Sequence, residues 1–60
     1  MTKQQILYFL RHNLTVAKDY LAASKHTEYP LLARLDYLHD TFKRLRIAHN
    51  LVDELEAFDK

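Results

Sequence analysis

Apolar residues recur every three or four positions through the second half of the chain. This spacing keeps them on one side of a helix, which has about 3.6 residues per turn, and predicts a single helix over residues 30–58. The predicted stripe consists of Leu31, Leu35, Leu38, Phe42, Leu45, Ala48, Val52 and Leu55. A helix with one apolar side requires a partner surface to cover it.

Another helix is predicted over residues 3–25. Thr2 and Gln5 fit a capping box, in which each side chain bonds the other residue's backbone N–H, so this helix is expected to begin near Lys3. Its apolar positions form two neighbouring stripes: Ile6, Leu7, Leu10, Leu14, Ala17 and Leu21 in the first, and Phe9, Val16, Tyr20 and Ala23 in the second. Two stripes predict two partners for this helix, one within the chain and one from another chain.

The apolar rhythm stops before Pro30, the single proline. Proline disfavours helix in the residue before it and suits the first turn of the helix that follows, which predicts a turn over residues 26–29. A turn this short makes the two helices antiparallel neighbours. We therefore predict one all-α domain over residues 1–60, an antiparallel helical hairpin.

The length of the chain argues for self-association. A domain of 60 residues buries only ~60% of the surface that its unfolded chain exposes, so its own core is marginal. Pairing with a second copy, as a four-helix bundle homodimer, is the simplest remedy. The residues expected in this core and dimer interface are Leu7, Leu10, Leu14, Leu21, Leu31, Leu35, Leu38, Phe42, Leu45, Val52 and Leu55. Phe9 is expected in the core with Phe42, whereas Tyr8 and Tyr37 are expected to face outwards.

The composition excludes several classes of site. The chain contains no glycine and no cysteine, which rules out glycine-rich phosphate loops and disulfides. Its longest apolar run, Ile6 to Leu10, is far shorter than the ~20 residues that span a bilayer. We therefore expect a soluble cytoplasmic protein without a membrane partner.

Candidate chemistry is sparse. Asp36, His39 and Asp40 share one helical side, but the other predicted helix offers no matching ligands on its main apolar stripe, so we predict neither a metal nor another cofactor. His49 lies at the edge of the apolar stripe and is interpreted as a residue at the boundary of the core. Ser24 is the only serine and is expected at the turn. Because no nucleophile has a credible setting, an enzyme is not predicted.

Basic residues form two groups, although the net charge is only +1. Arg11, Lys18 and Lys25 follow one another at seven-residue spacing, and Lys43, Arg44 and Arg46 are clustered. Such residues either cover the flanks of a helix interface or meet the phosphates of RNA or DNA. The flanking interpretation is favoured at this net charge, and nucleic-acid contact through these six residues remains the alternative.

The opening Met1-Thr2-Lys3-Gln4, the chain length and the glycine-poor hairpin resemble the Rop family of plasmid-copy-number regulators, and so does Leu38-His39-Asp40. The resemblance implies a hairpin that dimerises into a four-helix bundle and binds paired RNA loops. Lys3 and Lys25 fall at basic positions of that family. Leu14, however, stands where the family has an RNA-contacting phenylalanine, and the family has no proline at this turn. We take the resemblance as architectural, because function does not follow from architecture.

The favoured function is that of a small, non-catalytic regulatory or adaptor protein that binds another protein through residues left outside the bundle. The candidate contacts are Tyr8, Tyr37, Lys43, Arg44 and Ile47. One alternative is a Rop-like regulator that binds RNA or DNA. Another is a small inhibitor or antitoxin-like factor whose apolar side docks on a larger protein.

Overall fold

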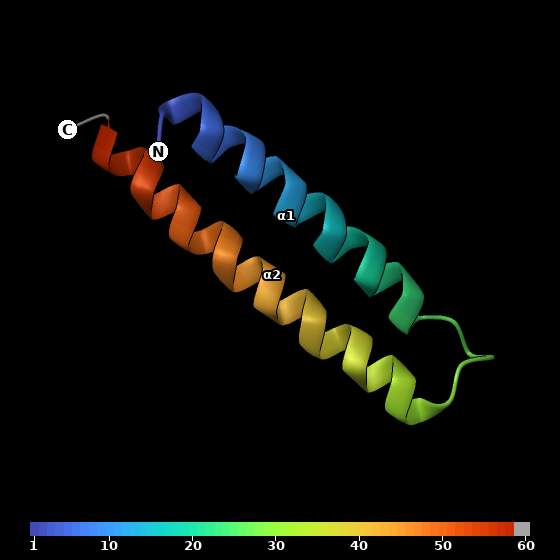
Figure 1. Ribbon diagram of the computed structural model, residues 1–60. Helices are drawn as coiled ribbons and strands as arrows, with labels where there is room; N and C mark the ends of the chain where they lie inside the picture. The colour runs from blue at the N-terminus through green and yellow to red at the C-terminus, as the bar shows by residue number, and fades with distance from the viewer. Residues whose placement is uncertain (59–60) are drawn as a thin grey trace.

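Two antiparallel helices make up the protein (Figure 1). The computed structural model describes residues 1–58. Helix α1 spans Lys3–Ser24 and helix α2 spans Leu31–Phe58, so the predicted all-α hairpin is confirmed. The chain forms a rod of 47 × 14 × 13 Å, with its two termini at one end and the turn at the other. Each helix boundary lies within one residue of the prediction.

The predicted capping box opens α1. The backbone N–H of Gln5 donates to the Thr2 hydroxyl oxygen at 3.1 Å, and the backbone N–H of Thr2 donates to Gln5 Oε1 at 2.8 Å. Two N–H groups that have no partner within the helix are thereby satisfied. The start of α1 lies beside the last turns of α2 (Figure 1).

Replacing Thr2 with alanine is expected to lower the free energy of unfolding by about 1 kcal/mol, because the first turn of α1 loses its hydroxyl acceptor. Chemical unfolding at a fixed protein concentration measures the change. Thr27→Ala is the control, since Thr27 is exposed in the connection and lies outside both helices. Equal losses in the two variants would contradict a specific role for the cap.

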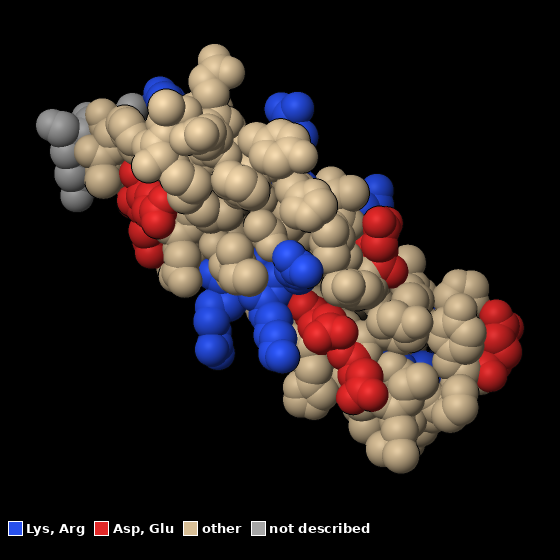
Figure 2. All heavy atoms as spheres, in the orientation of Figure 1, with Lys and Arg blue, Asp and Glu red and all other residues tan. Residues whose placement is uncertain are grey.

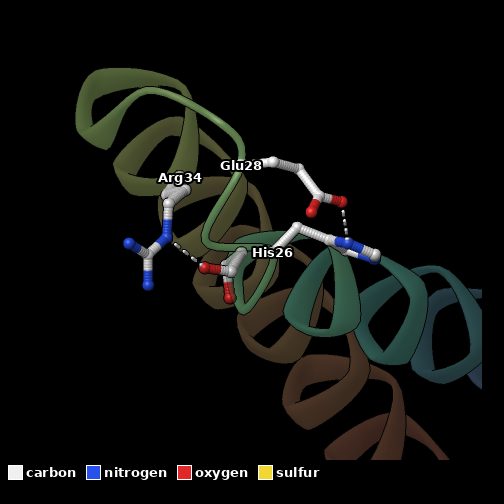
Figure 3. Close-up of polar contacts among 4 residues, drawn as sticks. His26, Glu28 and Arg34 are labelled. Carbon is white, nitrogen blue, oxygen red and sulfur yellow. Dashed lines mark hydrogen bonds and ion pairs between the residues drawn. The ribbon is translucent and has the colours of Figure 1, made fainter.

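Hydrogen bonds from both helices stabilise the connection over residues 25–30. The N–H groups of Lys25 and His26 donate to carbonyls in the last turn of α1. Arg34 Nε reaches back from α2 and donates to the Ser24 carbonyl at 2.9 Å, as Figure 3 shows. The Pro30 carbonyl accepts the N–H of Arg34 at 3.1 Å, so Pro30 stands just before α2 and not within its first turn as predicted. Ser24 is likewise the last residue of α1, whereas the sequence placed it at the turn.

The helices meet along a contact strip of mostly small or polar residues. Its buried members are Ile6, Asn13, Ala17 and Ser24 of α1 and Thr41, Ala48 and Leu51 of α2. Asn13 Nδ2 donates to the Phe9 carbonyl at 2.8 Å, and Asn13 Oδ1 accepts from Arg44 at 3.1 Å. Thr41 and Ser24 donate their hydroxyls to carbonyls of their own helices. Each buried polar side chain therefore has a partner, as a close helix contact requires.

The expected core residues Phe9 and Phe42 are not buried within the hairpin. Their exposed fractions are 43% and 66%, and Tyr37, which was expected to face outwards, is half-buried. The reason lies in the position of the contact strip on α2. It passes through Thr41 and Ala48, and Phe42 follows Thr41 by one residue, which is about 100° further round the helix. The stripe of large side chains and the stripe that joins the helices are therefore different.

Candidate functional site

Large apolar side chains are exposed on both helices. Eight of them have exposed fractions between 39% and 67%: Leu7, Leu14, Leu21, Leu31, Leu35, Phe42, Leu45 and Val52. Leu10 and Leu38 adjoin them and are half-buried, as is Leu55. We call the eight exposed residues, together with Leu10 and Leu38, the leucine face. It comprises all but one of the residues that the sequence placed in the core and dimer interface, and the hairpin alone does not cover it.

The two halves of the leucine face lie on the same side of the hairpin. Viewed down the long axis of the rod, one helix runs towards the viewer and the other runs away. Successive residues therefore turn anticlockwise on one helix and clockwise on the other. Positions that follow the contact strip by one or four residues therefore turn to one side on both helices. Leu14 follows the buried Asn13, and Phe42 follows the buried Thr41. The exposed leucines of α1 and the exposed apolar residues of α2 consequently form one continuous surface.

Two surface depressions lie on α1. The larger one, about 410 Å³, is lined by Leu7, Leu10, Arg11, Leu14, Thr15 and Lys18. A smaller one, about 290 Å³, is lined by Gln4, Leu7, Tyr8 and Arg11. These residues are spaced i, i+3, i+4 and i+7, the diamond into which a side chain of a neighbouring helix inserts in knobs-into-holes packing.

His49 lies within the α2 part of the leucine face, between Leu45 and Val52 in the three- and four-residue spacing. Its side chain is exposed, and Nδ1 lies 3.6 Å from the Asp53 carboxylate at i+4. A polar residue at one such position is a known device for fixing the register of helix pairs. His49 thus supplies a polar position within the otherwise apolar seam.

The basic residues of α1 lie beside the leucine face. Arg11 and Lys18 line the same depression as Leu7 and Leu14. Lys25 is exposed and ends α1 as its C-cap residue. Long basic side chains in this position can cover the edge of a helix interface with their alkyl stems.

The basic cluster of α2 is divided between two roles. Lys43 and Arg46 are exposed, whereas Arg44 is half-buried and donates to Asn13 across the contact strip. Asp40 precedes Arg44 by one helical turn, but the two form no ion pair within residues 1–58, and the guanidinium instead donates to Asn13. Figure 2 shows Lys and Arg atoms gathered over the middle of α2, next to Asp and Glu atoms nearer the turn.

The opposite side of the hairpin carries an aromatic face. Positions that precede the contact strip by one or four residues turn to this side, and they include Phe9, Val16, Tyr20, Tyr37 and Ile47. Tyr37 packs on Tyr20 and on Tyr29 of the connection, with ring centroids 6.0 Å apart in both pairs. Tyr8 extends this face outwards and lies edge-on to Phe9 at 5.5 Å. Of the predicted contacts, Tyr8, Lys43 and Ile47 are exposed.

Other kinds of site receive no support from the geometry. Within residues 1–58, the structure brings no three His, Cys, Asp or Glu side chains close enough to hold a metal ion. Neither helix, over the residues described, contains an apolar stretch that could cross a membrane. His26 contacts Glu28 at 2.9 Å in the exposed connection, where the two side chains turn towards each other (Figure 3).

Compared with models of known protein families, with curated proteins and with solved structures, the chain matches none of them. The comparisons therefore lend no support to the resemblance to the Rop family.

The sequence did not reveal the polar contacts that join the helices. Asparagine, threonine and arginine are usually exposed in proteins, so the residue types of Asn13, Thr41 and Arg44 do not indicate that they are buried. The spacing of Thr41 did carry a signal, since it precedes two members of the predicted stripe, Ala48 and Leu55, at seven-residue intervals. Helix α2 therefore has two stripes along its length, and one of them is the contact strip.

Proposed function

We propose that this protein is a small, non-catalytic regulator or adaptor that forms a four-helix bundle homodimer through its leucine face and binds a protein partner on the opposite side. The observation that carries the proposal is the exposure of eight large apolar side chains on one side of a 60-residue hairpin. Fully burying such a side chain contributes about 1.5–3 kcal/mol. A contiguous apolar surface of this kind is typical of an interaction site.

The aromatic face supplies the surface for a partner protein. Ile47 and Lys43 remain exposed there after the leucine faces have joined, because they lie on other sides of their helices, and Tyr8 stands where this surface borders the smaller depression on α1. Aromatic residues are enriched at protein interfaces. Tyr37 and Arg44 are half-buried next to this surface. Tyr37 packs on Tyr20, and Arg44 donates a hydrogen bond to Asn13.

Two alternative functions would use these surfaces differently. A nucleic-acid regulator would use Arg11, Lys18, Lys25 and the basic cluster of α2, but Arg11 and Lys18 border the leucine face and Arg44 is engaged within the hairpin. An inhibitor-like factor would place the leucine face on a larger protein and would not self-associate. Binding of RNA or DNA whose affinity falls steeply with salt would favour the first alternative.

The solution mass and photo-crosslinking test the proposal. Light scattering over a dilution series is expected to give twice the 7.2 kDa chain mass. A photoreactive phenylalanine at Ile47 is expected to crosslink to a different protein in the native host, whereas the same group at Leu14 is expected to crosslink only to a second copy. A monomeric mass with foreign crosslinks from Leu14 would replace the proposal by the inhibitor-like alternative.

A further inference from the structure

We infer that the second copy lies with its turn at the same end of the bundle, so that α1 of each chain packs against α2 of the other and Phe42 enters the large depression on α1. This inference rests on the self-association proposed above and adds its direction and its central contact. Three observations carry it: the heights of residues along the rod, the chemistry of the two depressions, and the position of the basic residues.

Contacts within the hairpin show which residues of the two helices lie at the same height, meaning the same position along the long axis of the rod. Asn13 bonds Arg44 and Tyr20 packs on Tyr37, so residue numbers at equal height add up to 57. By this relation Phe42 lies at the height of Thr15. A two-fold axis along the rod, which places both turns at one end, leaves every height unchanged. Phe42 of the second copy therefore arrives opposite Thr15, inside the diamond formed by Arg11, Leu14, Thr15 and Lys18.

The two depressions match the side chains that reach them. Phe42 is the most exposed aromatic residue of α2 and meets the larger depression, whose lining includes three leucines. His49, one heptad further, meets the smaller depression, which contains Gln4 and Tyr8. The ring of Phe42 thus faces Leu14 and the alkyl stems of Arg11 and Lys18, and the imidazole of His49 faces groups that can hydrogen-bond with it.

The opposite arrangement brings like charges together. If the turns lay at opposite ends, α1 would face α1 of the other copy in the reverse direction. With the two rods fully overlapped, Arg11 would meet Lys18 and Lys25 would meet Lys3. Like charges at neighbouring positions of an interface are destabilising. In the same-end arrangement the sum of 57 places Lys18 opposite His39 and Lys25 opposite Leu32, so that Arg11 opposite Arg46 is the one meeting of like charges that these three residues keep.

Distances between spin labels test the direction. The chain has no cysteine, so Thr27→Cys in the turn and Glu54→Cys near the open end each provide one labelling site per chain. Neighbouring helices in a bundle are ~8–10 Å apart, so pulsed electron resonance on the full chain is expected to give distances below about 30 Å at both sites. Helicity by circular dichroism checks that each labelled variant is folded.

The possible outcomes separate the inference from the proposed function. Distances of about 35 Å or more at both sites, approaching the rod length of 47 Å for the label in the turn, would overturn the same-end arrangement and leave the dimer standing. A complete lack of dipolar coupling would overturn both the arrangement and the self-association on which it rests. Phe42→Ala should weaken the dimer at least tenfold, and an unchanged dissociation constant would exclude Phe42 from the central contact.

Discussion

Replacing Leu45 with glutamate is expected to convert the dimer into monomers, whereas replacing Ile47 with glutamate is expected to leave it intact. Leu45 belongs to the leucine face and Ile47 to the aromatic face. A carboxylate forced into the apolar seam without a partner costs several kcal/mol, which corresponds to a rise of more than 100-fold in the dissociation constant. Sedimentation equilibrium at micromolar concentrations measures this change.

The two variants are matched within the hairpin itself. Both residues are 43% exposed and they lie two positions apart on α2. The hairpin alone therefore predicts similar, small effects of the two substitutions on its stability. A selective loss of association in Leu45→Glu locates the interface on the leucine face, and equal effects would contradict that location.

Replacing Arg44 with methionine is expected to lower the free energy of unfolding by about 1–3 kcal/mol, since it leaves the buried Asn13 oxygen without a donor. Methionine retains most of the alkyl stem of arginine, so the change reports mainly the lost hydrogen bond. Replacing Asn13 with leucine in the same chain removes the unsatisfied group. The double variant is expected to recover most of the loss, because two apolar partners can be nearly neutral relative to a bonded pair.

Thermal unfolding at one fixed protein concentration compares these variants, because the stability of a dimer depends on concentration. For a domain of this size, a loss of 1 kcal/mol lowers Tm by about 4–8 °C. If the double variant were less stable than Arg44→Met alone, the contact between Asn13 and Arg44 would not be the source of the effect.

The local signals in the sequence were sufficient to predict the hairpin. The spacing of leucines, the Thr2–Gln5 capping box and Pro30 each act over only a few residues, and each places a helix end within one residue of its position in the structure. Their physical causes are local steric and hydrogen-bonding preferences, which depend little on the rest of the chain.

The identity of the interhelical contact could not be predicted in the same way. Size and apolarity favoured Phe42 as a core residue, but the helices meet at Thr41 and Ala48. Small side chains allow a close approach of the two helices, and this choice depends on which residues face each other across the rod. The leucines of the candidate interface are recognisable by type, and their role in joining two copies stays a prediction. Of the expected outward contacts, Tyr37 and Arg44 are half-buried.

The connection between the helices has a consequence for divergence among related sequences. Within residues 1–58, no residue adopts a positive φ angle, so the reversal over residues 25–30 places no demand on glycine. Any L-amino acid is sterically permitted at most of its positions, and substitutions can accumulate there while the hairpin is retained. Distant homologues are therefore expected to share the seven-residue register of the two seams and to differ most in this connection.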